Sequence, residues 1–111
     1  MTVKDMVEKL GLSIIAGKEG VDKEITTGYV GDLLSWVMAN AKAGAVWITI
    51  QSHVNIIAVA SLINLSCIIV AEGATIDKET IVKANEEKIP LLSTNKNSYE
   101  IIKELIEIGI K

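Results

Sequence analysis

Polar side chains able to bind a small molecule follow two apolar runs of this 111-residue chain. They are Gln51, Ser52, His53 and Asn55 after the first run, and Ser93 and Thr94 after the second. Their amide, hydroxyl and imidazole groups donate and accept hydrogen bonds, which suits recognition of a polar ligand. A third apolar run ends at Glu72-Gly73. If the three runs are neighbouring parallel strands, these groups meet at the carboxyl edge of the sheet, where α/β proteins bind ligands.

His53 is the only histidine and the first residue to consider for acid–base chemistry. A histidine base needs an orienting carboxylate, and Asp32 and Glu72 are the candidates. His53 has no second histidine or available cysteine with which to bind a metal, because Cys67 lies within an apolar run and is predicted to be a small core residue. We therefore expect no catalytic residue, metal or cofactor. An enzyme component that uses His53 with a nearby carboxylate remains the alternative.

A strand-like run is joined to a helical one by Gly28-Tyr29-Val30-Gly31-Asp32. The segment lacks the glycines and lysine of a phosphate-binding GxxxxGK[ST] loop. It reads instead as a tight turn in which Asp32 is the N-cap of the following helix. Tyr29 and Asp32 join the predicted ligand-binding residues if the strand before them points the same way as the later strands.

These groups are positioned by a strand, a helix and a second strand that occupy about 29 residues. Ala45–Ile50 and Cys67–Ala71 have the β-branched composition of buried strands, and Val54–Ile63 is apolar on nearly every side. A connection of this length predicts parallel strands. The large aromatic residues are Trp36 and Trp47, of which one belongs in the core and an exposed one marks an interface.

The remaining elements follow from periodicity and capping residues. We expect strands at Leu12–Ala16, Ile25–Val30 and Ile89–Leu92, and helices at Val3–Leu10, at residues 33–41, from Thr75 or Asp77 to Lys88, and from a Ser98 cap to Ile108. The third helix is expected to turn Ile81, Val82 and Ala84 inward. The prediction is an α/β fold: a single domain over residues 1–111, with a mainly parallel β-sheet, βαβ crossovers and flanking helices.

Composition argues against two classes of partner. All eleven basic residues are lysine, and the absence of arginine from a chain of net charge -3 argues against nucleic acid. The apolar middle is divided at Asn64 and Ser66, whereas a membrane span needs about 20 consecutive apolar residues. The N-terminus lacks a signal-peptide profile, so we expect a cytoplasmic protein without membrane insertion.

The chain resembles the DRTGG-domain family, specifically its small stand-alone members. The resemblance rests on GYVGDLLSWVMANAKAGAVWITIQSHVNIIAVASL, CIIVAEG and KIPLLST, and extends over about residues 12–108. Similar domains lie between CBS domains in regulated pyrophosphatases and in some phosphotransacetylases, and the fold is similar to the N-terminal domain of HPr kinase/phosphorylase. The resemblance implies a regulatory domain, commonly oligomeric, without a recognised catalytic centre. The place of the Asp-Arg-Thr-type motif is held here by residues 51–55, QSHVN, so a charged-ligand role does not transfer.

The functional hypothesis is a non-enzymatic regulatory module that senses a small ligand or mediates protein association. A purely structural dimerisation domain is a further alternative. Only Asp32, Lys42 and Glu72 are charged between residues 29 and 73, and this apolar surface predicts a homodimer. We expect Trp36, Met38 or the outer face of the central helix in its interface.

Overall fold

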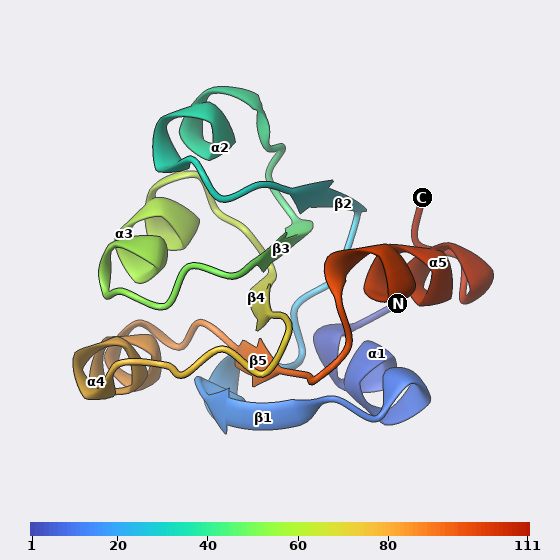
Figure 1. Ribbon diagram of the computed structural model, residues 1–111, viewed down its shortest axis with the longest axis horizontal. Helices are drawn as coiled ribbons and strands as arrows, with labels where there is room; N and C mark the ends of the chain where they lie inside the picture. Colours follow the sequence, from blue (N-terminus) through green and yellow to red (C-terminus); the bar gives the residue numbers. More distant parts are fainter.

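Five strands form one sheet in the computed structural model, which describes residues 1–111, and helices cover both of its faces (Figure 1). The strands are β1 (Ser13–Ala16), β2 (Thr27–Val30), β3 (Ala45–Thr49), β4 (Cys67–Val70) and β5 (Leu91–Ser93). The helices are α1 (Val3–Leu10), α2 (Leu34–Asn40), α3 (Asn55–Leu62), α4 (Lys78–Glu87) and α5 (Ser98–Glu107), and a short 3-10 helix, η1 (Lys18–Gly20), follows β1. The predicted α/β fold and its elements are confirmed, with ends that differ by a few residues.

Four strands run parallel, and the fifth runs against them. The order across the sheet is β1-β5-β4-β3-β2. β2, β3, β4 and β5 pair in parallel, whereas β1 pairs antiparallel with β5. The parallel crossovers predicted from Ala45 onward are confirmed, and β2 points the same way. The carboxyl ends of four strands therefore lie at one edge of the sheet.

β3 and β4 are buried on both faces of the sheet. α1 and α5 cover one face, and α2, α3 and α4 cover the other (Figure 1). The side chains toward α1 and α5 are Val46, Ile48, Cys67 and Ile69. Those toward α2, α3 and α4 are Trp47, Ile68 and Val70. Full burial of one such aliphatic side chain contributes roughly 1.5–3 kcal/mol, so these two strands carry much of the core.

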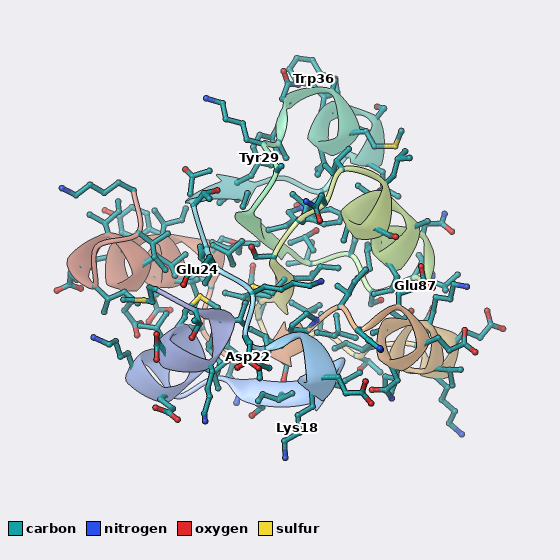
Figure 2. The ribbon with its side chains drawn as sticks, turned by 180° about the vertical axis from the view of Figure 1, so that it is seen from behind. Lys18, Asp22, Glu24, Tyr29, Trp36 and Glu87 are labelled. Atoms are coloured by element: carbon teal, nitrogen blue, oxygen red, sulfur yellow. The ribbon has the colours of Figure 1, made fainter.

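The predictions that one tryptophan belongs in the core and that Cys67 is a small core residue are confirmed. Trp47 is fully buried, and its indole Nε1 donates a hydrogen bond to the carbonyl oxygen of Gly31 at 2.8 Å. Cys67 is also fully buried, and this burial raises the pKa of its thiol well above the usual value. Trp36, by contrast, lies on the outer surface of α2 and is 64% exposed (Figure 2). One tryptophan thus belongs to the core and one to the surface.

Two predicted helix caps are wrong. The N-cap of α2 is Leu33, without a side-chain bond, because the Asp32 carboxylate bonds to the end of β3 instead. α5 is capped by Asn97 rather than Ser98. Glu100 lies three residues after Asn97, so the two residues complete a capping box.

The inward prediction for Val82 in α4 is also wrong. Its side chain is 57% exposed, whereas Thr80 and Ala84 are fully buried. Residues four apart share a helix face, and the residue midway between them points away from it. Ile106 in α5 is likewise exposed, at 54%, because Ile101 and Leu105 occupy the inner face of that helix. None of the helices is long and apolar enough to cross a membrane.

Gly17 is the tightest point of the connection between β1 and η1. Its φ of +70° is in the left-handed region, and its N–H donates to Asn85 Oδ1 at 2.8 Å. A Cβ at this position would lie 1.8 Å from the carbonyl oxygen of Ile89. Only glycine therefore satisfies both the backbone angle and the close contact with the chain before β5.

We predict that Gly17→Ala lowers the free energy of unfolding by more than about 3 kcal/mol, the scale of severe substitutions. The matched control is Gly11→Ala. Gly11 has a similar φ of +66° but open space around its Cβ position, so its loss is limited to about 1–2 kcal/mol of left-handed backbone strain. Urea unfolding followed by tryptophan fluorescence measures both variants. Equal losses would show that the contact with Ile89 is unimportant.

Candidate functional site

A cavity of about 560 Å³ opens at the carboxyl ends of β4 and β5, beside the start of β1. Two of the predicted ligand-binding residues, Ser93 and Thr94, line it. The other lining residues are Gly11, Ser13, Ile15, Gly73, Ala74, Ile76, Ile81, Asn95 and Lys96. Small-molecule sites span about 300–1,000 Å³ and combine apolar walls with a few polar groups. The cavity fits that description.

The antiparallel strand β1 brings Ser13 into this cavity. Ser13 lies opposite Ser93 in the register of β1 and β5. Side chains of directly opposed residues share a face of the sheet, roughly 5 Å apart. Ser13 is not among the predicted site residues, because pairing between the first and last strands leaves no local signal in the sequence. Asn95 could have been found from its place beside Ser93 and Thr94.

The loops that enclose the cavity are tied to each other by backbone hydrogen bonds. Gly73 N–H donates to the Thr94 carbonyl oxygen at 2.9 Å, and Glu72 N–H donates to the Lys96 carbonyl oxygen at 2.9 Å. The Lys96 ammonium in turn donates to both carboxylate oxygens of Glu104 on α5, at 2.8 Å each. The loop after β4 and the loop after β5 are therefore tied to each other, and the second is also tied to α5.

Asp32 and Gln51 take part in a different set of contacts, at the end of β3. Asp32 Oδ1 accepts hydrogen bonds from Thr49 Oγ1 at 2.7 Å and from Ile50 N at 2.9 Å. Gln51 Nε2 donates to the Asp32 carbonyl oxygen at 2.9 Å. These bonds hold the turn after β2 against the end of β3. Direct ligand contact by Asp32 or Gln51 stays a prediction.

His53 pairs with a carboxylate, but not with either candidate named from the sequence. Its Nδ1 lies 2.8 Å from Asp77 Oδ2, so the partner is Asp77 rather than Asp32 or Glu72. Asp32 is engaged with β3, and Asp77 precedes α4, which packs beside α3. The His53 and Asp77 side chains are 70% and 47% exposed. This pair lies at the surface and not in the lining of the 560 Å³ cavity, which we call the Ser93 cavity.

The loop that carries His53 is held by α4. The carbonyl oxygen of Ser52 accepts a hydrogen bond from Thr80 Oγ1 at 2.7 Å, and a longer one from Asp77 N at 3.4 Å. Thr80 is fully buried, so this hydrogen bond fixes the loop to the inner face of α4. Asn55 begins α3 and its side chain is exposed. Ser52 and Asn55 also lie outside the cavity lining, and ligand binding by them stays a prediction.

Tyr29 lies on the edge strand β2, near α2, with β3 and β4 between it and β5 (Figure 2). It packs against the apolar cluster that contains Trp47. A second cavity of about 330 Å³ lies between β2 and α5, with mainly apolar lining residues that include Tyr29, Val30 and Ile106. The predicted ligand-binding residues therefore do not converge on one site. Only Ser93 and Thr94 share the larger cavity.

Comparison with known proteins identifies a family and a solved structure of similar fold. The family model described as the DRTGG domain matches residues 5–108. The structure is similar to the CBS and DRTGG domains of the regulatory region of Clostridium perfringens pyrophosphatase, solved in complex with the activator diadenosine tetraphosphate. The TM-score is 0.71 at 18% sequence identity, over 95% of this chain and 46% of that chain. The chain thus spans about half of that regulatory region. A search of curated proteins finds no match.

We predict that Asp32→Ala lowers the free energy of unfolding by about 2 kcal/mol, because it leaves the buried Thr49 hydroxyl and the Ile50 amide without an acceptor. Asp32→Asn keeps Oδ1 and is expected to lose less. His53→Ala should lose less than about 1 kcal/mol, since it removes only an exposed pair. Urea unfolding of the three variants decides the order. A larger loss for His53→Ala than for Asp32→Ala would contradict these roles.

Proposed function

Because the chain belongs to the DRTGG-domain family, we propose that it is a non-enzymatic regulatory module that binds a small ligand and acts through protein association. The observation that carries this proposal is the cavity at the carboxyl ends of β4 and β5. It combines apolar walls with hydroxyl and amide side chains in a volume of about 560 Å³. We assign the ligand contacts to Ser93 and Thr94, joined by Ser13 and Asn95.

The similar regulatory region supports a sensing function for this fold. That protein region was solved with an activator bound, which is the behaviour expected of a module that reports ligand concentration. A sensor needs two features: a site for the ligand, and a second surface through which binding changes a partner. The Ser93 cavity is our candidate for the first feature. The exposed apolar surface of α2 is our candidate for the second.

The His53–Asp77 pair is the observation that favours the alternative, an enzyme component. A histidine hydrogen-bonded to a carboxylate at 2.8 Å has the geometry of an oriented base. General bases, however, act on substrates held in a water-excluding site, and this pair is exposed outside the larger cavity. We therefore favour the regulatory proposal.

Ligand binding at the Ser93 cavity can be tested with a thermal-shift screen of a small-molecule library. A compound at ten times its Kd stabilises the native state by about 1.4 kcal/mol, which raises the Tm by several degrees in a domain of this size. We expect at least one such compound, and we expect Ser93→Leu to abolish its effect, because this change removes the hydroxyl and places an isobutyl group in the cavity. Ser98→Leu, at the start of α5 and outside the cavity lining, is the matched control. Failure to find a stabilising compound, or equal stabilisation of all three proteins, would reject the proposed site.

We also propose that the chain is a homodimer that associates through α2. Leu33, Trp36 and Met38 are 61%, 64% and 45% exposed, and α2 carries no charged residue. The residues of α2 and the edge strand beside it thus form an apolar surface of the kind that marks interfaces.

Light scattering at about 100 μM, a concentration that populates even a micromolar dimer, should give twice the chain mass. Trp36→Glu should give the monomer mass, because a charge at the centre of an apolar interface is left unpaired. The control is Tyr99→Glu, an exposed aromatic position on α5 at the opposite face, which should remain dimeric. A monomer mass for the unchanged protein would refute the dimer.

A further inference from the structure

We infer that the ligand of the Ser93 cavity is uncharged: a nucleoside-sized molecule with an apolar ring and several hydroxyl or amide groups, not a phosphorylated one. This inference rests on the proposed ligand-binding function and specifies its chemistry. It follows from the charge, the backbone donors and the free side chains around the cavity.

The only charged residue in the lining is already neutralised. Lys96 Nζ donates to Glu104 Oε1 and Oε2, both at 2.8 Å. The two side chains are 43% and 26% exposed, so this pair is only partly screened by water. A phosphate that enters the cavity would meet an ammonium already bound to a carboxylate, together with the negative charge of Glu104. The chain contains no arginine that could replace it.

The backbone amides of the enclosing loops are also mostly engaged. Anion sites without a cation usually use free backbone N–H groups in a loop or at a helix start. Here the N–H groups of Glu72, Gly73, Ala74, Thr94 and Lys96 all donate within the chain. The loops therefore offer little to an anion, and desolvation of a phosphate would go largely uncompensated.

The groups that remain available are neutral. Ser13 and Ser93 face each other across β1 and β5, and neither hydroxyl has a hydrogen-bond partner within the chain. The Asn95 carboxamide likewise has no partner, and lies beside Gly73. Two hydroxyls and one amide can each donate and accept, which matches ligand hydroxyl or amide groups.

The apolar part of the lining provides a place for a ring. Ile15, Ile76 and Ile81 belong to β1, the loop before α4 and α4 itself. None of the three is fully buried, so each retains apolar surface that a ligand can cover. A flat heterocycle against these isoleucines, with a sugar toward the serines and Asn95, satisfies both halves of the lining. A nucleoside is the simplest molecule with this division.

Adenosine and AMP test the inference, because they differ only in the phosphate. We would titrate each into the full ¹⁵N-labelled chain at about pH 7 and 50 mM salt, and follow the backbone amide signals of Ser13, Gly73 and Asn95. We expect adenosine to shift these signals and to bind at least about tenfold more tightly than AMP, since the phosphate gains no free cation. Glu104→Gln should free the Lys96 ammonium to bind the phosphate, so that AMP binds as tightly as adenosine or more tightly. Glu86→Gln breaks a Lys–Glu pair elsewhere, with Lys83 on α4, and should leave the preference unchanged.

Each other outcome overturns the inference. One such outcome is tighter binding of AMP than of adenosine by the unchanged protein. A second is that adenosine at roughly 10 mM shifts none of the three signals. The third is an adenosine preference that Glu104→Gln leaves intact. The proposed function has a separate test, the library screen, and only a negative screen would reject it. A charged compound that stabilises the protein but does not stabilise Ser93→Leu would overturn the inference of an uncharged ligand and would still support a ligand site.

Discussion

The burial of β3 and β4 on both faces is the constraint on which the rest of the structure depends. Their side chains are apolar at every position except Thr49, so both faces of these strands are shielded from water. Helices must then cover both faces, and parallel neighbours require the crossover connections that supply them. Because β2 to β5 run in one direction, their carboxyl ends and the loops that follow meet at one edge. The candidate site is a consequence of that edge.

The position of the cavity along the edge follows from where the chain changes faces. α2, α3 and α4 connect successive parallel strands on one face, and after β5 the chain returns to the face of α1, where α5 begins. β1 then fills the place beside β5 in the opposite direction. Loops diverge at such a change and leave room between them. The start of β1 and the loops after β4 and β5 enclose that room, whereas the ends of β2 and β3 are closed by contacts of their own.

Polar groups at this edge divide into those that hold the fold and those that remain available. Asp32 ties the turn after β2 to β3, His53 meets Asp77, and Lys96 meets Glu104. His53 and Lys96 each meet a carboxylate in a partly exposed pair, whereas Asp32 accepts hydrogen bonds from a hydroxyl and a backbone amide of the neighbouring strand. The hydroxyls of Ser13 and Ser93 carry no charge and tolerate partial exposure without a partner. These charged groups at the edge are thus engaged within the chain, and the groups left available in the cavity are neutral.

The sequence by itself determined the class of fold, the order of its elements and the core. Apolar runs with β-branched residues, helical periodicity and capping residues are local signals, and they identified each strand and α-helix and the carboxyl edge of the sheet. The sequence placed Ser93 and Thr94 at that edge because they come at the end of a strand. The tertiary structure alone decided which polar groups meet. Asp77 pairs with His53 from 24 residues away, Ser13 faces Ser93 across strands from opposite ends of the chain, and Asp32 turns from its helix to β3. Such contacts depend on the direction and register of strands distant in sequence, which no local pattern encodes, because register is set by the packing of the whole sheet against its helices.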